Sequence, residues 1–297
     1  MRTLLSRRKV WVCLLLICLL TGCQRASGAS EGRVTSGATL EDQGSDTLVN
    51  LALAWAEAYQ QEHPDVRISV TGGGSGAGLA ALINGTTDIA NASRPIKPEE
   101  VDQGKQKGFT PQEHVVARDA IAVIVNPENP VGQLTLDQIA DIYSGKISNW
   151  KDVGGDDRPI VRLSRETNSG THVYFLEHVL RHGRPDDKTL FSTDTLLLPS
   201  SEGISAEIRQ NPNAIGYDGL GYVTPDLKVI AVAASPGGAY VRPSVQTVNN
   251  KTYPIARDLY MYTAGEATGR TLAYLQWILG PEAQALVATL GFVPVSS

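Results

Sequence analysis

The stretch PIVRLSRETNSGTHVYFLEHVL, residues 159–180, places a strand, a short polar loop and a helix in direct succession. Residues 159–164 are typical of a strand. Apolar residues then recur at helical spacing from Thr171 to Leu180. A strand that runs straight into a helix is the building unit of α/β proteins, so this stretch predicts an α/β fold.

The loop between the predicted strand and helix has the composition of an anion site. Arg165 lies four residues before Ser169, which Gly170 and Thr171 follow. A helix N-terminus offers free backbone N–H groups and a partial positive charge. The hydroxyl groups and the guanidinium add donors that suit a tetrahedral oxyanion. An ordinary capped helix beside a surface arginine would have the same residues, so the loop alone leaves both interpretations open.

The rest of the chain repeats the alternation of strands and helices. Helices are predicted at 48–61, 79–84, from Pro98, at 134–143, after the leucines of 196–198, at 270–278 and at 282–290. Strands are predicted at 66–70, 87–90, 115–125, 214–217, 229–233 and 259–262. This length of alternating elements favours two lobes over a single core.

The first residues predict export. Residues 1–9 carry four basic side chains and no acid, and residues 10–20 are uninterruptedly apolar. Leu20-Thr-Gly-Cys23 is similar to the processing site of bacterial lipoproteins. We therefore expect a signal peptide over 1–22, a lipidated Cys23 and a flexible tether over 23–33. An ordinary secretory signal that contains a cysteine is the alternative.

Charge and cysteine content exclude several classes of function. Without residues 1–22 the chain has 22 basic and 31 acidic residues, a net charge of −9, which makes nucleic acid an unfavourable partner. An anionic ligand is compatible with this charge, because a site needs only local positive potential. No cysteine follows Cys23, so neither a disulfide nor a cysteine-based metal site is expected in the exported part.

Three further segments share the composition of the Arg165 loop, each just before a predicted helix, and two of them also follow a predicted strand. They are Gly44-Ser45-Asp46-Thr47, the glycine-rich run from Gly72 through Ser75 and Gly76 to Gly78, and Ser93-Arg94-Pro95. Several such loops in one chain suggest that helix N-termini converge on one anionic ligand.

Nucleotide binding and catalysis find little support. The glycine-rich run has the spacing of a dinucleotide fingerprint, but no acidic residue ends a strand about twenty positions later. Gly145-Lys146 is followed by Ile147, which excludes a Walker A loop. Ser75 could act as a nucleophile, for example in a phosphate-ester hydrolase, only if a base reached it, and the sequence identifies none. We expect no cofactor and no metal.

Together, these motifs resemble the phosphate-binding lipoproteins of bacterial ABC importers from about residue 38 to the C-terminus. The resemblance rests on the four loops and on Asp88-Ile-Ala-Asn-Ala-Ser-Arg-Pro95, Tyr143-Ser-Gly-Lys-Ile-Ser-Asn-Trp-Lys-Asp-Val-Gly-Gly155, Ala214-Ile-Gly-Tyr217, Tyr253-Pro-Ile255 and Gly291-Phe-Val-Pro294.

The resemblance implies a two-lobe periplasmic-binding-protein fold of type II, with two crossings between the lobes. Lobe one is expected at 34–119 plus 257–297 and lobe two at 120–256. The implied protein is a non-enzymatic extracytoplasmic receptor, monomeric and held to the membrane only by its lipid, which binds inorganic phosphate and docks on permease subunits. Its ligand-binding residues would be Ser45, Asp46, Thr47, Ser75, Gly76, Ser93, Arg94, Arg165, Ser169, Gly170 and Thr171.

One position departs from the resemblance. Many members have an aspartate in the 88–95 loop, where it accepts a proton from bound phosphate, and Ser93 stands there in this chain. Asp46 is the nearest substitute, although it also suits a helix N-cap. Selection against sulfate, molybdate or arsenate is therefore left open. Arg94 either adds a second charge or pairs with Glu99 or Glu100, and pairing is favoured slightly.

Overall fold

The computed structural model describes residues 39–295. The predicted signal peptide (1–22), Cys23 and the predicted tether (23–33) lie outside the described residues.

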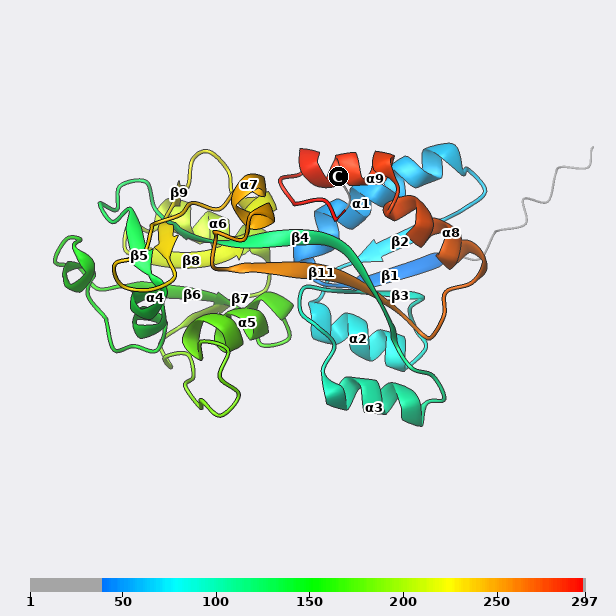
Figure 1. Ribbon diagram of the computed structural model, residues 1–297, viewed down its shortest axis with the longest axis horizontal. Coiled ribbons are helices and arrows are strands. Elements are labelled where there is room, and N and C mark those ends of the chain that lie inside the picture. Colours follow the sequence, from blue (N-terminus) through cyan, green and yellow to red (C-terminus); the bar gives the residue numbers. More distant parts are fainter. Residues whose placement is uncertain (1–38, 296–297) are drawn as a thin grey trace, which may run out of the picture. The chain divides into compact units, whose positions relative to one another are not determined.

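The elements follow the predicted alternation (Figure 1). The strands are β1 (Leu40–Gly44), β2 (Ile68–Thr71), β3 (Ile89–Ala92), β4 (Gln112–Val125), β5 (Gln133–Thr135), β6 (Val161–Arg165), β7 (Leu196–Leu198), β8 (Ala214–Gly219), β9 (Lys228–Val229), β10 (Ala231–Ala233) and β11 (Ala256–Thr263). The helices are α1 (Asp46–Glu62), α2 (Ser75–Ile83), α3 (Pro98–Gln106), α4 (Leu136–Tyr143), α5 (Gly170–Phe175), α6 (Ser201–Gln210), α7 (Val245–Asn249), α8 (Gly269–Ile278) and α9 (Pro281–Thr289), with shorter helical turns η1 (Trp150–Val153), η2 (Leu176–Leu180) and η3 (Leu220–Tyr222).

Most strands join one sheet in the order β2-β1-β3-β11-β4-β8-β6-β7, and β10 pairs with β5 separately. Strands β1, β2 and β3, here called the first half of the sheet, are parallel to one another. Strands β6, β7 and β8, here called the second half, are also parallel. The antiparallel strands β4 and β11 lie between the two halves.

Strand β4 belongs to both parts of the sheet. It pairs with β11 from Gln112 to Ala120, and from Ile121 to Val125 it pairs with β8 instead. Arg257 of β11 lies directly opposite Asp119 of β4. The two strands therefore connect the halves at neighbouring positions (Figure 1).

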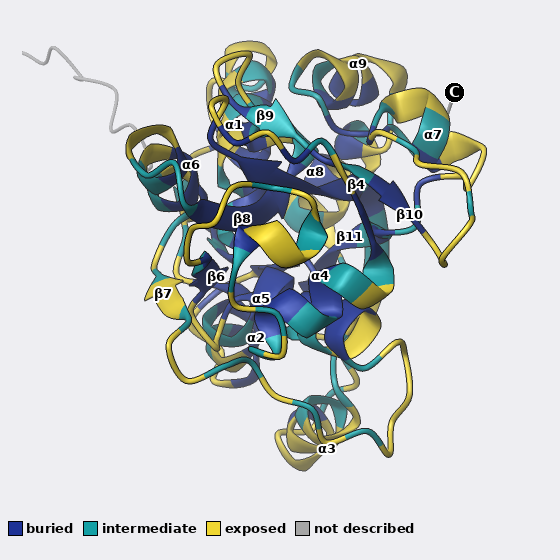
Figure 2. Ribbon diagram, turned by 90° about the vertical axis from the view of Figure 1, so that its left-hand side faces the viewer, coloured by how far each residue is buried: buried dark blue, intermediate teal, exposed yellow. Residues whose placement is uncertain are grey.

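Helices cover both faces of each half. In the first half, α1, α8 and α9 lie on one face and α2 and α3 on the other (Figure 1). In the second half, Ile121, Val123 and Val125 of β4 pack into the same core as α4 and α5. Ala122 and Ile124 point to the other face and pack against α6. This alternation buries the central strands on both sides (Figure 2).

The structure corrects several predicted elements. Residues 40–44 form strand β1, which the sequence analysis did not predict. Residues 229–233 were predicted as one strand, but β9 pairs with β4 while β10 pairs with β5. The leucines of 196–198 form the edge strand β7, and α6 begins only at Ser201, where the Ser200 hydroxyl accepts from the Gly203 N–H. Such differences arise because strand pairing is decided by distant segments.

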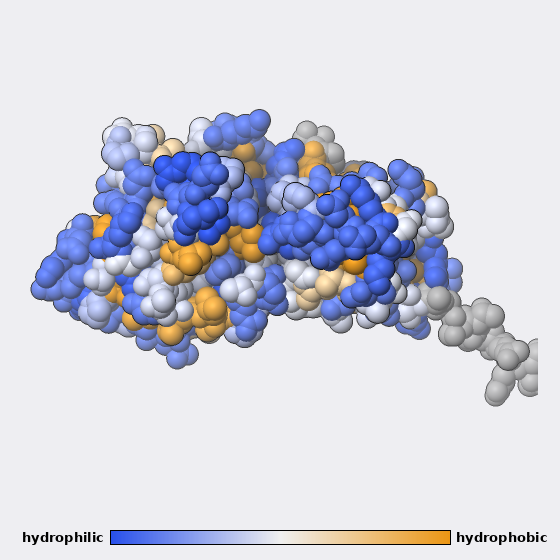
Figure 3. All heavy atoms as spheres, turned by 90° about the horizontal axis from the view of Figure 1, so that it is seen from below, coloured by the Kyte–Doolittle hydropathy of each residue, from blue (hydrophilic) through white to orange (hydrophobic). Residues whose placement is uncertain are grey.

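The face in Figure 3 is mostly hydrophilic, with its hydrophobic residues in small separate groups. Within residues 39–295, no helix combines the length and the apolar composition that crossing a membrane requires. The same part of the chain contains no cluster of three His, Cys, Asp or Glu side chains that could share a metal ion.

Candidate anion-binding site

The four predicted loops meet between the two halves of the sheet. Three of them follow the carboxyl ends of β1, β2 and β6 and open α1, α2 and α5, and the fourth follows β3. The carboxyl ends of parallel strands lie at one edge of a sheet, where α/β proteins bind their ligands.

Serine and threonine hydroxyls form the centre of the site. Ser75 Oγ lies 3.3 Å from Ser93 Oγ and accepts a hydrogen bond of 3.0 Å from the Ser93 N–H. Thr47 Oγ1 of α1 lies 2.9 Å from Thr171 Oγ1 of α5, so these two hydroxyls join the halves. All four residues are almost fully buried. We refer to these four side chains as the hydroxyl cluster.

Arg165 lies beside the hydroxyl cluster at the end of β6 and is 1% exposed. Its Nη2 donates 2.7 Å to Asp46 Oδ2 and 2.8 Å to the Pro199 carbonyl, and its Nη1 donates 2.9 Å to Ser201 Oγ. Asp46 Oδ1 in turn accepts from the Gly73 N–H at 3.0 Å. Arg165 therefore forms a buried ion pair that links α1 to the second half.

A second carboxylate lies behind Arg165. Ser201 Oγ donates 2.9 Å to Asp218 Oδ1, so Ser201 connects Asp218 to the arginine. Burial raises the pKa of Asp218 to about 6, while the charge of Arg165 opposes the rise. The sequence analysis missed both Ser201 and Asp218, because neither stands in a loop with a recognisable anion motif.

Arg257 is a second buried arginine at the site, and the sequence analysis missed it as well. Its Nη2 lies 2.9 Å from Thr171 Oγ1, 3.3 Å from Thr47 Oγ1 and 3.0 Å from Asp119 Oδ2. Burial raises the pKa of Asp119, and the charge of Arg257 opposes this. The one available signal was an Arg-Asp dipeptide in or beside each of two predicted strands, Arg118-Asp119 and Arg257-Asp258.

The other predicted residues lie in or beside the loops. Ser45 is buried at the N-cap position of α1 without a capping hydrogen bond from its side chain, and the Gly76 N–H donates to the Asn168 carbonyl. The Ser169 side chain caps α5 by accepting from the Thr171 N–H. Arg94 makes a two-pronged ion pair with Glu100, at 2.8 and 2.7 Å, so the pairing that the sequence favoured is confirmed.

The chemistry of the site is binding rather than bond cleavage. Hydroxyls, helix N-termini and two guanidinium groups are all donors to an oxyanion, and their burial removes competing water. Among the described residues, no imidazole or carboxylate makes a hydrogen bond with Ser75 Oγ, so no base activates it as a nucleophile.

Comparisons with known proteins agree with this architecture. Residues 29–282 match the family described as PBP superfamily domain. The phosphate-binding protein PstS of Pseudomonas aeruginosa is 33% identical over 92% of this chain and 85% of its own length. The protein of the same name from Bacillus subtilis is 32% identical over 91% of this chain and 85% of its own length.

Solved structures give the same result. A crystal structure from Clostridium perfringens, of a phosphate ABC transporter substrate-binding protein with bound phosphate, is 34% identical and has a TM-score of 0.77 over 87% of this chain and 100% of that one. An ABC-type phosphate transport receptor from Vibrio cholerae is 27% identical, with a TM-score of 0.69 over 86% of this chain and 99% of that one. The predicted α/β two-lobe binding-protein fold is thereby confirmed. The chain belongs to the PBP superfamily and, within it, to the family of the PstS proteins.

Proposed function

We propose that this protein is a non-enzymatic receptor that binds inorganic phosphate outside the cytoplasm and delivers it to an ABC importer. The names of the relatives support phosphate, and the bound phosphate in the Clostridium perfringens structure supports it further. The observation that carries the proposal is the meeting of four strand-to-helix loops around a buried hydroxyl cluster with two arginines.

We assign the ligand to the space that these loops enclose. The hydroxyl cluster, the N-terminus of α5 at Gly170 and the guanidinium of Arg165 supply donors. Ser45, Gly76 and Ser169 contribute the backbone of the same loops. Arg94 is left out of this set, because its guanidinium is paired with Glu100.

Asp46 is the carboxylate that we assign to selectivity. It is held by Arg165 and by the Gly73 N–H, at the first turn of α1. A carboxylate acceptor favours a ligand that carries a proton over a fully deprotonated anion, whose oxygens leave it unsatisfied. Ser93 stands where many family members have their aspartate, so Asp46 is the remaining candidate for this role.

The remaining assignments extend the family pattern to this chain. We propose that lobe one comprises 34–119 and 257–297, that lobe two comprises 120–256, and that β4 and β11 are the crossings. We also propose that Cys23 carries a lipid anchor and that the receptor acts as a monomer on permease subunits. Mass spectrometry of the membrane fraction would detect the lipid at Cys23.

Calorimetric titration with phosphate tests the proposed function, and Arg165→Ala tests the site. Removing the guanidinium leaves the bound anion without its partner and should cost roughly 2–5 kcal/mol of binding free energy. Arg162→Gln is the matched control, because Arg162 is an equally buried arginine of β6 that pairs with Asp194 instead. Phosphate binding of wild-type strength in Arg165→Ala would show that the site is misassigned.

Competition and turnover separate the alternatives. Sulfate and molybdate, which are fully deprotonated, should displace phosphate poorly in the wild type, and sulfate should compete better in Asp46→Asn. If sulfate already binds as tightly as phosphate, the protein is a receptor for another oxyanion. Hydrolysis of a phosphate ester that disappears in Ser75→Ala would replace the receptor with an enzyme.

A further inference from the structure

Arg257 is the residue of the site for which neither the motifs nor the resemblance supplies a role. We propose that Arg257 is the second arginine of the anion site: it orients the hydroxyls of Thr47 and Thr171 toward the ligand and supplies positive charge from the crossing strand β11. This inference rests on the proposed function, because it assigns a residue to the same ligand.

The contacts of Arg257 reach three of the four loops of the site. Its Nη2 donates to the hydroxyl oxygens of Thr47 in α1 and Thr171 in α5, at 3.3 and 2.9 Å. Its Nη1 donates 2.8 Å to the Ser93 carbonyl. One guanidinium thus touches both halves of the sheet from the strand between them. Its carbon Cζ also lies 5.7 Å from the centre of the Tyr174 ring, a cation–π contact that restricts its position.

The hydrogen-bond geometry explains how Arg257 would help an anion. An arginine has only donors, so each threonine oxygen that contacts it must accept. The hydroxyl hydrogens of Thr47 and Thr171 are then available for donation to another acceptor. In this structure one of the two hydroxyls donates to the other, and their oxygens lie 2.9 Å apart. An oxyanion that replaces this mutual contact can receive both O–H groups. Arg257 is therefore a positioning residue whose charge also polarises the two donors.

The partners of the two arginines differ. Arg165 is surrounded by protein acceptors, namely Asp46, Ser201 and the carbonyls of Pro199 and Leu198. Arg257 bonds the Asp119 carboxylate and the Ser93 carbonyl, but it also contacts two rotatable hydroxyls, and its buried Nε has no hydrogen-bond partner among the described residues. A buried donor without a partner costs free energy, which argues against a purely structural role.

Asp119 keeps Arg257 in place. The two residues face each other across the antiparallel pair β4–β11, and neither side chain is more than 2% exposed. Opposite charges at directly opposed positions stabilise such a pair. The Asp119 carboxylate also accepts from the Leu220 N–H at 3.1 Å. The carboxylate orients the guanidinium but also offsets part of its charge, so removing the carboxylate should affect an anionic ligand less than removing Arg257.

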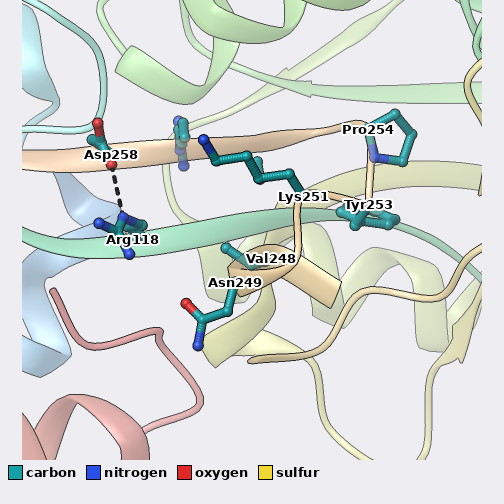
Figure 4. A pocket seen from close by; sticks show the side chains of 9 residues that line it. Arg118, Val248, Asn249, Lys251, Tyr253, Pro254 and Asp258 are labelled. Atoms are coloured by element: carbon teal, nitrogen blue, oxygen red, sulfur yellow. Dashed lines mark ion pairs between the residues drawn. The ribbon is translucent and has the colours of Figure 1, made fainter. Parts of the chain in front are cut away.

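A cavity of about 470 Å³ lies behind the crossing strands, and Arg257 lines it together with Arg118, Lys251 and Asp258. Figure 4 shows the Arg118–Asp258 ion pair at 3.4 Å and the Lys251 side chain beside it. Arg257 therefore borders this cavity while its terminal nitrogens reach the hydroxyl cluster. A small guanidinium compound could enter the space that a shortened side chain leaves.

The test compares Arg257→Gln, Arg257→Lys, Asp119→Asn and the control Arg162→Gln by phosphate calorimetry and by denaturant unfolding. Arg257→Gln should weaken phosphate binding roughly 30-fold or more, and Arg257→Lys should recover part of the loss. Asp119→Asn should weaken phosphate binding less than Arg257→Gln does, because the variant loses part of the support for Arg257 but also removes a negative charge near the anion. Arg162→Gln should change stability without changing affinity. In Arg257→Ala, added methylguanidinium should restore phosphate binding.

The outcomes distinguish the inference from the proposed function. A wild type that binds no phosphate overturns the proposed function, and this inference falls with it. A wild type that binds phosphate while Arg257→Gln binds within threefold overturns the inference alone. Equal losses in Arg257→Gln and Asp119→Asn would also overturn it, since they would mark the pair as structural. If Arg257→Gln does not fold, Arg257→Lys decides: phosphate binding within threefold of the wild type in Arg257→Lys rejects the role.

Discussion

Gly170, the first residue of α5, lies against the serines of the hydroxyl cluster. A methyl group added there would lie 2.4 Å from Ser75 Oγ and 2.5 Å from Ser93 Oγ. These hydroxyls can rotate away, so we expect Gly170→Ala to fold with a modest loss of stability. The displaced hydroxyls would no longer face the ligand, and phosphate affinity should fall by about 1–3 kcal/mol. Calorimetry and denaturant unfolding on the same preparation measure the two effects.

Gly132→Ala is the control for this substitution. A methyl group on Gly132 would approach nothing more closely than Lys228 Cε, at 4.0 Å. Its affinity for phosphate should equal that of the wild type. Should Gly170→Ala bind phosphate as tightly as Gly132→Ala, the hydroxyl cluster is not where the anion binds.

The residues that the sequence predicted share a local signature. A Ser or Thr beside Gly, between a strand and a helix, can be recognised from a few neighbouring positions, and all four such loops meet in the structure. Arg257 and Asp119 have no such signature. Their burial depends on the register of β4 and β11, which pairs residues 138 positions apart in the chain. Without this register the sequence shows only two Arg-Asp dipeptides, Arg118-Asp119 and Arg257-Asp258, and does not tell which of the four side chains are buried.

At the scale of elements, β1 shows that the amino-acid composition of a segment can fail to predict a strand. Its sequence, Leu-Glu-Asp-Gln-Gly, has two acids and one large apolar residue, so no strand was predicted. Yet it pairs on both sides, with β2 and with β3. Asp42 is consequently 1% exposed, and neither of its carboxylate oxygens has a hydrogen-bond partner among the described residues. Neighbouring strands impose this burial on a residue that favours water.

Because Asp42 is buried, we expect the free energy of unfolding to depend on pH. Burial raises its pKa from 3.8 to about 8, so the folded chain holds this proton to higher pH than the unfolded chain does. The associated stability is present at acidic pH and is lost as the pH rises toward 8, by up to about 1.4 kcal/mol per pH unit. Asp42→Asn removes this titration. Its unfolding free energy relative to wild type should therefore increase between pH 5 and pH 8.

Denaturant unfolding at several pH values measures this difference. Titrations of all other groups cancel between wild type and variant, because they are common to both. Glu57→Gln, an exposed position of α1, is the control and should show a constant difference across the same range. A constant difference for Asp42→Asn as well would mean that Asp42 is ionised or hydrated at every pH tested.

At the scale of the whole described unit, few polar contacts join the two halves of the sheet apart from β4 and β11. They include the Arg165–Asp46 ion pair, the bond from Tyr222 to the Asp46 carbonyl at 2.6 Å and the bond from Asn168 to the Gly73 carbonyl at 2.8 Å. An anion bound among the same loops would add donors from both sides. A ligand shifts a conformational equilibrium by its difference in affinity for the two states, so phosphate should favour the closed arrangement.

Spin labels can measure this shift, because a chain that starts after Cys23 has no cysteine of its own. Labels at Glu57→Cys in α1 and Glu177→Cys in η2 would report on the distance between the halves. We expect a broad distribution without ligand and a narrower one at shorter distance with phosphate. The pair Glu57→Cys and Glu99→Cys, both beside the first half, should not respond. If calorimetry shows saturation while the first distribution stays the same, phosphate binds to a preformed closed site, and the expected shift toward a closed arrangement is wrong.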